Sequence, residues 1–471
     1  MGEEHELAGA LARDLQRLVK AAADSVAGVQ SNELIDRVTG HLGVPLAQAL
    51  VVTRVFEDWE HANIQAGVDA YLAEHGTVTD WFGIAGGQRG HEDLVGMLVA
   101  GRNHGLYELG AVDYRTAAIG PEAAADVVQL GLVGTVAPDG ARVLIGVRGA
   151  NPQYGQMQCR LEVLSGSRAA ATAARDRIEQ LMVEHDVLRG QVLAFGVSEH
   201  RGNELLTFLP RPALDEGDVV LPEGVLDAVE RHTIGIAEQG ARLLAAGQHL
   251  KRGLLLHGPP GTGKTHTVRY LMGRLPGSTV VVLTGSAMRF VSKAATLARR
   301  LQPSVVVVED VDLIAEDRSH HAGGGPLLFS LLDAMDGVGG DADVTFLLTT
   351  NRASQLEKAL ADRPGRVDLA VEIPLPDAAG RAALLELYSR GLNVTADLAP
   401  VVEATEGVTA SFVKELLRRA TLRAITARPE DPQVTIVDAD LAEALAEMKD
   451  ARGALTRSLL GSSDQERREP G

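Results

Sequence analysis

Hydrophobic residues near the start of the chain recur at the spacing of a helix, and charged residues fill the positions between them. Over residues 1–30 this pattern predicts an amphipathic helix, and a second helical stretch is expected over 45–74. We therefore expect a helical N-terminal region over residues 1–80. The leucines that define the first apolar face are Leu7, Leu11, Leu15 and Leu18.

The pattern changes to alternation after Val127, which is typical of strands. Two alternating runs flank the turn sequence Pro138-Asp139-Gly140 and so predict a β-hairpin. With a helix and two more strands, these runs predict a small α+β domain over 81–212 that handles a client or a regulator. The expected elements lie at 132–137, 142–149, 158–164, 167–187 and 191–197.

In the second half of the chain, apolar strands alternate with helical segments. This order predicts an α/β fold, a parallel sheet with helices on both faces, over residues 213–374. Residues 375–455 read as a helical subdomain, and 456–471 as a polar, disordered tail.

The composition narrows the function classes. The 471 residues carry a formal net charge of −18, which argues against a nucleic-acid surface because such surfaces are usually basic. The one cysteine, Cys159, permits no disulfide framework, so we expect a cytoplasmic protein. No apolar run approaches the ~18 residues that span a bilayer, so no membrane span is expected. Aromatic residues are only 3% of the chain, which makes an exposed aromatic ring noteworthy.

A glycine-rich run follows an apolar strand pattern and opens into a predicted helix that begins at Thr265. Its glycines let backbone N–H groups turn toward a polyphosphate, and the helix N-terminus adds partial positive charge. Lys264 can reach the β- and γ-phosphates of ATP, and the Thr265 hydroxyl can hold Mg²⁺. The expected nucleotide-binding residues are Gly258, Pro259, Pro260, Gly261, Thr262, Gly263, Lys264, Thr265 and His266.

Two carboxylates follow four consecutive valines, a run that suits a strand buried on both faces. Glu309 and Asp310 then lie at the carboxyl end of that strand, where ligands bind in parallel sheets. One carboxylate would join the Mg²⁺ shell, and the next would polarise water for attack on the γ-phosphate. The alternative is that the acids merely end a strand.

Other polar groups follow the next strand. Asn351 ends the run Phe346-Leu-Leu-Thr-Thr, where an amide could position the attacking water. Arg363 and Arg366 flank a Pro-Gly turn, and arginine is the preferred residue for bidentate phosphate contacts. The alternatives are an ordinary loop asparagine and two solvated arginines.

Together these motifs resemble the AAA family of ring-forming ATPases over about half the chain. The resemblance takes the glycine run as Walker A, residues 305–310 as Walker B and Asn351 as sensor 1. It implies a homo-hexamer in which Arg363 and Arg366 act as arginine fingers on the neighbouring subunit's ATP. Asp336 matches the intersubunit-signalling position. Ala410 and Ser411 match the place where the family's helical lid turns against the adenine.

The chain departs from the family at the end of Walker B. The family usually reads Asp-Glu, whereas this chain reads Glu309-Asp310. The resemblance therefore places Glu309 at the metal position beside Thr265, and Asp310 at the water-activating position. The inverted order resembles the branch that contains the mitochondrial chaperone of the Rieske iron–sulfur protein. That branch hydrolyses ATP, so activity is expected.

Two interpretations of Phe290 are open. Many AAA rings pull polypeptide with an aromatic–hydrophobic pair, and Phe290-Val291 is the candidate here. The alternative is a core position, because Phe290 and Leu297 share helical spacing. If Phe290 is a core residue, the loop over 316–325 is the other candidate to face the pore.

The favoured function is an ATP-hydrolysing ring that remodels or translocates protein clients. The first alternative is an AAA ATPase that acts on nucleic acid, and the second is an ATP-binding scaffold with little turnover. A fused zinc protease is not expected because no His-Glu-x-x-His occurs. The chain ends in Arg-Glu-Pro-Gly, so the tail by which proteasomal ATPases dock is not expected either.

Overall fold

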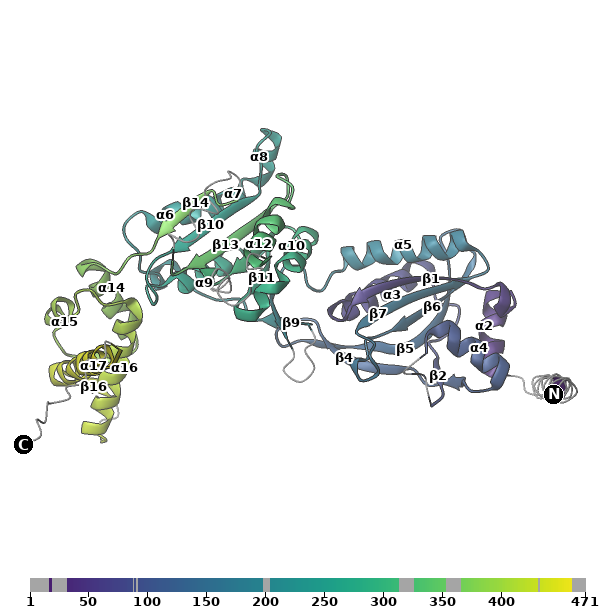
Figure 1. Cartoon of the computed structure of the whole chain (residues 1–471), viewed down its shortest axis with the longest axis horizontal. Coiled ribbons are helices and arrows are strands. Elements are labelled where there is room, and N and C mark those ends of the chain that lie inside the picture. The colour runs from purple at the N-terminus through teal and green to yellow at the C-terminus, as the bar shows by residue number, and fades with distance from the viewer. Residues whose placement is uncertain are drawn as a thin grey trace, which may run out of the picture. The chain divides into compact units, whose positions relative to one another are not determined.

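A computed structural model gives two compact units (Figure 1). The first contains residues 1–189 and 197–208, and the second contains 190–196 and 209–471. The structure describes residues 17–18, 32–87, 89, 92–197, 204–312, 326–352, 366–430 and 433–459.

The first unit is built on a five-stranded antiparallel sheet in the order β1-β7-β6-β5-β4. The predicted hairpin is confirmed: β5 pairs with β6, and Gly140 in the turn has a φ of 84°. The short strands β2 and β3 pair separately. The strands are β1 Leu50–Glu57, β2 Gly83–Ala85, β3 Glu108–Gly110, β4 Asp113–Ala118, β5 Ala124–Val136, β6 Arg142–Arg148 and β7 Gln158–Ser165.

Helices cover both faces of this sheet. Val143 and Ile145 of β6 belong to a core that includes residues of α3 and α5, whereas Leu144 belongs to a core with α2 and α4. Successive residues of a strand point to opposite faces, so the two cores lie on the two sides of the sheet. The helices are α2 Glu33–Leu42, α3 His61–His75, α4 Leu94–His104 and α5 Arg168–Glu184.

This arrangement differs from the expected boundary at residue 80. Ile64 and Val68 of α3 are fully buried against strand residues such as Val133. Residues 32–80 therefore share their cores with the α+β domain and do not form a separate helical region. The helical stretch expected over 45–74 is wrong in its first half, because residues 50–57 form strand β1 and only the second half lies in α3. Local spacing did not reveal the sheet that buries the apolar face of α3.

The strands of the second unit form a sheet in the order β14-β10-β13-β12-β11-β8, whereas the residues of β9 fall almost wholly in the first unit. The described pairings from β14 to β8 are parallel, as the alternation of strands and helices predicts. The strands are β8 Val192–Val197, β9 Glu204–Leu209, β10 Arg252–His257, β11 Thr279–Leu283, β12 Ser304–Val308, β13 Val344–Thr350 and β14 Leu369–Glu372.

The strand β8 alters the expected domain limit at residue 213. Val192 of β8 pairs in parallel with Val280 of β11, so this strand extends the sheet that carries the glycine-rich loop. Strand pairing is a long-range property, and the local pattern of residues 191–197 could not assign the strand to one sheet or the other.

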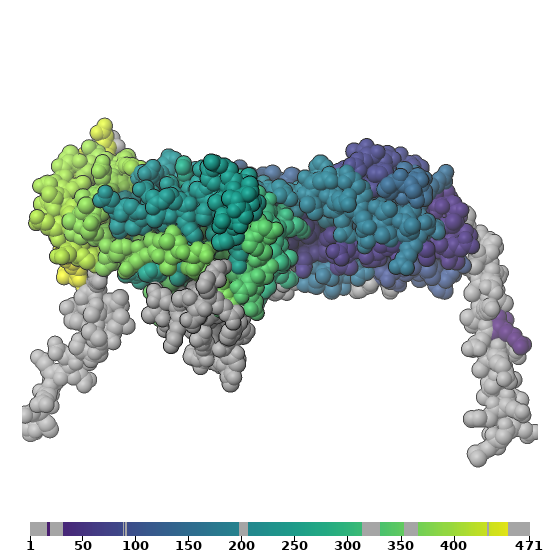
Figure 2. Space-filling view, turned by 90° about the horizontal axis from the view of Figure 1, so that it is seen from above, coloured from purple at the N-terminus to yellow at the C-terminus, as the bar shows by residue number. Residues whose placement is uncertain are grey.

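Helices flank this sheet and then form a lid, which Figure 2 shows in yellow-green against the sheet-bearing part of the unit. No helix among the described residues is long and apolar enough to cross a membrane. The helices before the lid are α6 Val225–Glu230, α7 Ile236–Glu238, α8 Gly240–Ala245, α9 Lys264–Arg274, α10 Val291–Arg300 and α12 Pro326–Asp336. The lid contains α14 Ala378–Ser389, β15 Asn393–Val394, α15 Ala399–Ala404, α16 Ala410–Ala427, β16 Thr435–Ile436 and α17 Asp438–Leu459.

Candidate nucleotide-binding site

The glycine-rich loop joins the central strand β10 to helix α9. Gly258, Gly261 and Gly263 have φ values of 142°, 78° and 113°, which side-chain-bearing residues rarely adopt. A Cβ on Gly258 would also lie 2.2 Å from the backbone oxygen of Ile373. The loop conformation therefore requires glycine at the position where the sequence predicts a phosphate cradle.

Lys264 is the first residue of α9, directly after this loop, and is only 6% exposed. Its Nζ donates to the backbone oxygens of Gly258 and Pro259, each at 2.8 Å. Burial lowers the pKa of Lys264, and the nearby charges of Asp310 and Asp312 oppose that shift. The ammonium group is thus held where the loop glycines would place a phosphate.

Thr265 and Glu309 meet at the carboxyl end of β12. The Thr265 hydroxyl lies beside the Glu309 carboxylate, although the two residues are far apart in sequence. Burial raises the pKa of Glu309, the Thr265 hydroxyl lowers it, and the neighbouring Asp310 charge raises it. One hydroxyl and one carboxylate are oxygen donors of the kind Mg²⁺ takes while it keeps several waters, so this pair fits that ion.

Asp310 and Asn351 meet at the ends of the adjacent strands β12 and β13. The Nδ2 of Asn351 donates to Oδ1 of Asp310 at 3.1 Å. The backbone N–H of Asp310 donates to the Thr349 hydroxyl at 2.9 Å. Asp310 also has a φ of 52°, a left-handed conformation that is uncommon for a residue with a side chain. Two residues predicted separately from the sequence are therefore in direct contact.

Asp312 is a residue that the sequence analysis missed. Its carboxylate is 6% exposed, and Oδ1 accepts from the Thr350 hydroxyl at 3.0 Å and from the Asn351 backbone N–H at 3.1 Å. Asp312 thus fixes the backbone from which the Asn351 amide projects. The signal that could have found it is its position two residues beyond Asp310, at the end of the same strand.

The lid reaches the glycine-rich loop through the start of α16. The backbone N–H of Ser411 donates to the Gly261 oxygen at 3.1 Å, and the Ser411 hydroxyl donates to the same oxygen at 3.3 Å. Ala410 is buried in the core of the lid. The structure therefore brings Ser411 to the loop, as expected, while Ala410 contributes to lid packing.

Of the other predicted residues, Thr262 and His266 make local contacts, whereas Pro260 is exposed. The Thr262 hydroxyl donates to the Pro259 oxygen at 2.9 Å, which tightens the loop. The Nε2–H of His266 donates to the backbone oxygen of Asp218 at 2.9 Å, so His266 ties α9 to the segment that precedes the sheet.

Arg366 is buried in the described chain. It is 5% exposed, and Nε and Nη2 donate to the two carboxylate oxygens of Asp336 at 3.0 and 2.6 Å. The hydrogen bonds to Asp336 raise the pKa of Arg366. Arg366 therefore pairs with Asp336 of its own chain instead of projecting outward, and Arg363 lies outside the described residues.

Phe290 is a core residue. It is 7% exposed, and its ring lies 5.7 Å from the ring of Phe195 in β8. The core interpretation of the sequence is therefore the one that the structure supports. The loop over 316–325, the other candidate to face a pore, lies outside the described residues.

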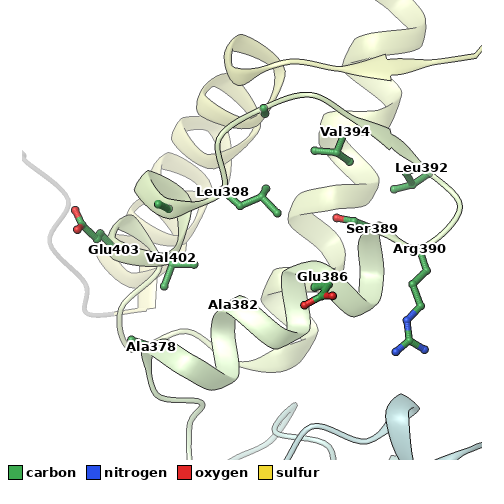
Figure 3. Close-up of a pocket in the computed structure, with 12 residues that line it drawn as sticks. Ala378, Ala382, Glu386, Ser389, Arg390, Leu392, Val394, Leu398, Val402 and Glu403 are labelled. Carbon is green, nitrogen blue, oxygen red and sulfur yellow. The ribbon is translucent and has the colours of Figure 1, made fainter.

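A hollow in the lid does not belong to this constellation. It has a volume of about 850 Å³ and lies between α14, the β15 segment and α15 (Figure 3). Its walls are mainly apolar, with Ala382, Leu398 and Val402 among them. None of the predicted site residues lines it, so we place the candidate site at the glycine-rich loop.

Comparison with known proteins identifies the central part of the second unit. Residues 254–375 match the family described as "ATPase family associated with various cellular activities (AAA)". The chain is 32% identical over 264 residues to the ATP-dependent zinc metalloprotease FtsH of Mycobacterium tuberculosis, covering 52% of the chain and 34% of that relative. It is 36% identical over 198 residues to the proteasome-activating nucleotidase of Methanospirillum hungatei, covering 39% and 47%.

A third relative gives the same extent of match. The 26S proteasome regulatory subunit 8 homolog of Schizosaccharomyces pombe is 33% identical over 209 residues, which are 41% of this chain and 51% of that protein. The chain thus spans about a third to a half of the length of these curated relatives.

Proposed function

Because residues 254–375 form an AAA ATPase domain, we propose that this chain hydrolyses ATP to drive work on protein clients. One observation carries the proposal. Thr265 contacts Glu309 while Asn351 contacts Asp310, so the groups that a hydrolytic site needs converge beside the glycine-rich loop.

Each residue has a distinct role in this proposal. The loop backbone and Lys264 bind the phosphates, and Ser411 brings the lid against the loop. Thr265 and Glu309 would hold Mg²⁺, which would offset the negative charge of the phosphates. Asp310 accepts the proton of the attacking water, and Asn351 orients that water.

The inverted order of the two acids is compatible with hydrolysis. Glu309 is one methylene longer than the usual aspartate and reaches the Thr265 hydroxyl. Asp310 is one methylene shorter than the usual glutamate, and it receives a hydrogen bond from Asn351. These contacts favour a working ATPase over a scaffold that only binds ATP.

We further propose that the active form is a homo-hexamer in which Arg363 and Arg366 act on the ATP of the neighbouring subunit. Arg366 can take that role only after it leaves Asp336, since both of its bonded nitrogens are engaged there. The pair would then report whether a neighbour's nucleotide is present.

Protein is the favoured class of client. The matched relatives include a protease and a proteasome activator by name, and the net charge of −18 disfavours nucleic acid. We propose that the first unit engages the client. Because Phe290 is buried, we do not assign it to threading a chain through a narrow aromatic pore.

The test is steady-state ATP hydrolysis as a function of protein concentration, with Asp310→Asn as the variant. We expect turnover to rise cooperatively in the unmodified chain and to be lost in Asp310→Asn, while ATP still binds. Asp341→Asn is the matched control, because Asp341 is exposed and lies outside the site. Full activity in Asp310→Asn would exclude the proposed chemistry. DNA-stimulated turnover at physiological salt would favour the nucleic-acid alternative.

A further inference from the structure

A small polar hollow lies in the first unit, which carries none of the ATPase motifs. It has a volume of about 210 Å³. The turn after β2, the strands β4, β5 and β6 and the turn over 151–156 all contribute to its wall. The lining residues used below are Gly86, Arg89, Asp113, Gln129, Arg148, Asn151 and Tyr154.

Arg148 is the residue of this wall that needs a chemical explanation. It is only 6% exposed, which is unusual for arginine. Its Nη1 and Nη2 donate to the backbone oxygens of Glu92 and Arg89. A guanidinium has five N–H donors, so three donors of Arg148 have no acceptor among the described residues.

No carboxylate within ion-pair distance neutralises Arg148 in the described part of the chain. Asp113 lines the same hollow, but it pairs with Arg89 at 3.1 Å. The residues of the adjoining loop that the structure does not describe are Gln88, Gly90 and His91, and none of them carries a carboxylate.

More distant charges act on Arg148 without bonding it. Burial lowers its pKa most, the charges of Glu162, Asp93 and Tyr107 oppose that shift, and the charge of Arg160 adds to it. Asp93 already caps α4 through the Gly96 N–H at 2.7 Å. The surroundings therefore stabilise the charge of Arg148 in part, but they leave its remaining hydrogen-bond donors unused.

The other groups around the hollow are also suited to a polar ligand. The Asn151 side chain, an amide that can both donate and accept, lines the hollow. Oε1 of Gln129 is buried without a donor. The Tyr154 ring is 47% exposed, in a chain in which aromatic residues are scarce. Gly86, with a φ of 151°, exposes backbone at the same wall.

We propose that this hollow binds a small anion through a phosphate or carboxylate group held by the guanidinium fork of Arg148. Arginine matches both groups because its planar donors can bond two oxygens at once. The volume of the hollow suits a small ion, since it would hold about seven water molecules. It is smaller than the ~300 Å³ at which typical ligand pockets begin. The proposal does not depend on ATP hydrolysis.

The test is calorimetric titration of the full-length chain with inorganic phosphate and, separately, with succinate, at constant ionic strength. All proteins carry Lys264→Ala, so that the glycine-rich loop does not dominate phosphate binding. Arg148→Lys keeps the charge and removes the fork, and Asn151→Ala removes one amide. Arg102→Gln is the matched control, because Arg102 is an exposed arginine of the same unit and does not line the hollow.

We expect one of the two anions to bind, Arg148→Lys to weaken it at least about tenfold and Asn151→Ala to weaken it severalfold. Arg102→Gln should bind as the parent does. Binding of phosphate alone or of succinate alone identifies the group that the site recognises. Melting temperatures measured without anion show which variants are folded. If Arg148→Lys is not folded, the affinity of Asn151→Ala tests the proposal instead. Equal affinity in the parent and the folded variants, or binding of both anions weaker than about 10 mM, would overturn the proposal.

Discussion

The two units are both built from a sheet and helices, but they differ in the direction of their strands. Each has a sheet covered by helices, but the sheet of the first is antiparallel and the described pairings from β14 to β8 in the second are parallel. In a parallel sheet the carboxyl ends of all strands meet at one edge, so polar residues that follow the strands converge. Glu309, Asp310 and Asn351 show this directly. In an antiparallel sheet, neighbouring strands run in opposite directions, so their carboxyl ends lie at opposite edges. The hollow of the first unit is therefore lined by single residues from several segments.

This difference explains why one site is visible in the sequence and the other is not. The candidate nucleotide site consists of short runs that each contain several of its residues, such as Lys264 and Thr265. The hollow of the first unit combines Gln129, Arg148 and Asn151 with a turn after β2, and no short motif contains them. Mutations in both units test this difference. We expect the largest effect, a loss of ATP affinity, at the glycine-rich loop.

Lys264→Ala should weaken ATP binding at least about 100-fold, because a charged donor to phosphate contributes about 3 kcal/mol. Titration with a fluorescent ATP analogue measures this. Lys414→Ala, an exposed lysine of the lid, should bind as the unmodified chain does. Unchanged affinity in Lys264→Ala would remove the phosphate-binding assignment from the second unit.

Phe290→Ala should destabilise the second unit by about 3 kcal/mol, because it empties a buried aromatic position against Phe195. Denaturant unfolding followed by circular dichroism gives this value. Ser286→Ala, at an exposed position of the same segment, should change stability little. A stable Phe290→Ala variant that has lost only client-stimulated turnover would instead make Phe290 a pore residue.

The first unit should lose stability in mild acid because of His61. His61 is 1% exposed, and burial lowers its pKa to about 4, partly offset by a hydrogen bond to the Val128 backbone oxygen. Between pH 6.5 and 4 the unfolded chain binds a proton that the folded chain does not, so stability falls as pH falls. The expected loss is about 3 kcal/mol.

Unfolding of the full chain at several pH values, compared with His61→Gln, isolates this contribution from the titrating carboxylates. The variant should lose stability less steeply across the same interval. Identical pH profiles would show that His61 does not remain neutral in the folded unit.

Asp312→Ala should lower kcat about tenfold with little change in ATP affinity, because Asn351 loses its backbone anchor but contacts to the phosphates remain. Single-turnover hydrolysis separates the two effects, and Asp341→Ala serves as the exposed control. A loss of ATP binding equal to the loss of turnover would show that Asp312 supports the whole loop rather than the position of Asn351.

The sequence by itself predicted the candidate nucleotide site of the second unit. Residues 258–265, the acids after the valine strand and Asn351 identified the AAA domain, because a phosphate cradle requires glycine, lysine and a hydroxyl residue at fixed spacing. The sequence also predicted the β5–β6 hairpin, because turn residues and alternation are local properties.

The tertiary structure alone decided the features that depend on long-range packing. It placed α3 in the core of the first sheet, although a domain limit was expected between them at residue 80. It also placed β8 in the second sheet, although a domain limit was expected between them at residue 213. It buried Arg366 against Asp336 and Phe290 against Phe195. It also enclosed Arg148 without a carboxylate partner among the described residues. Burial and pairing are set by residues distant in the chain, so no local spacing can specify them.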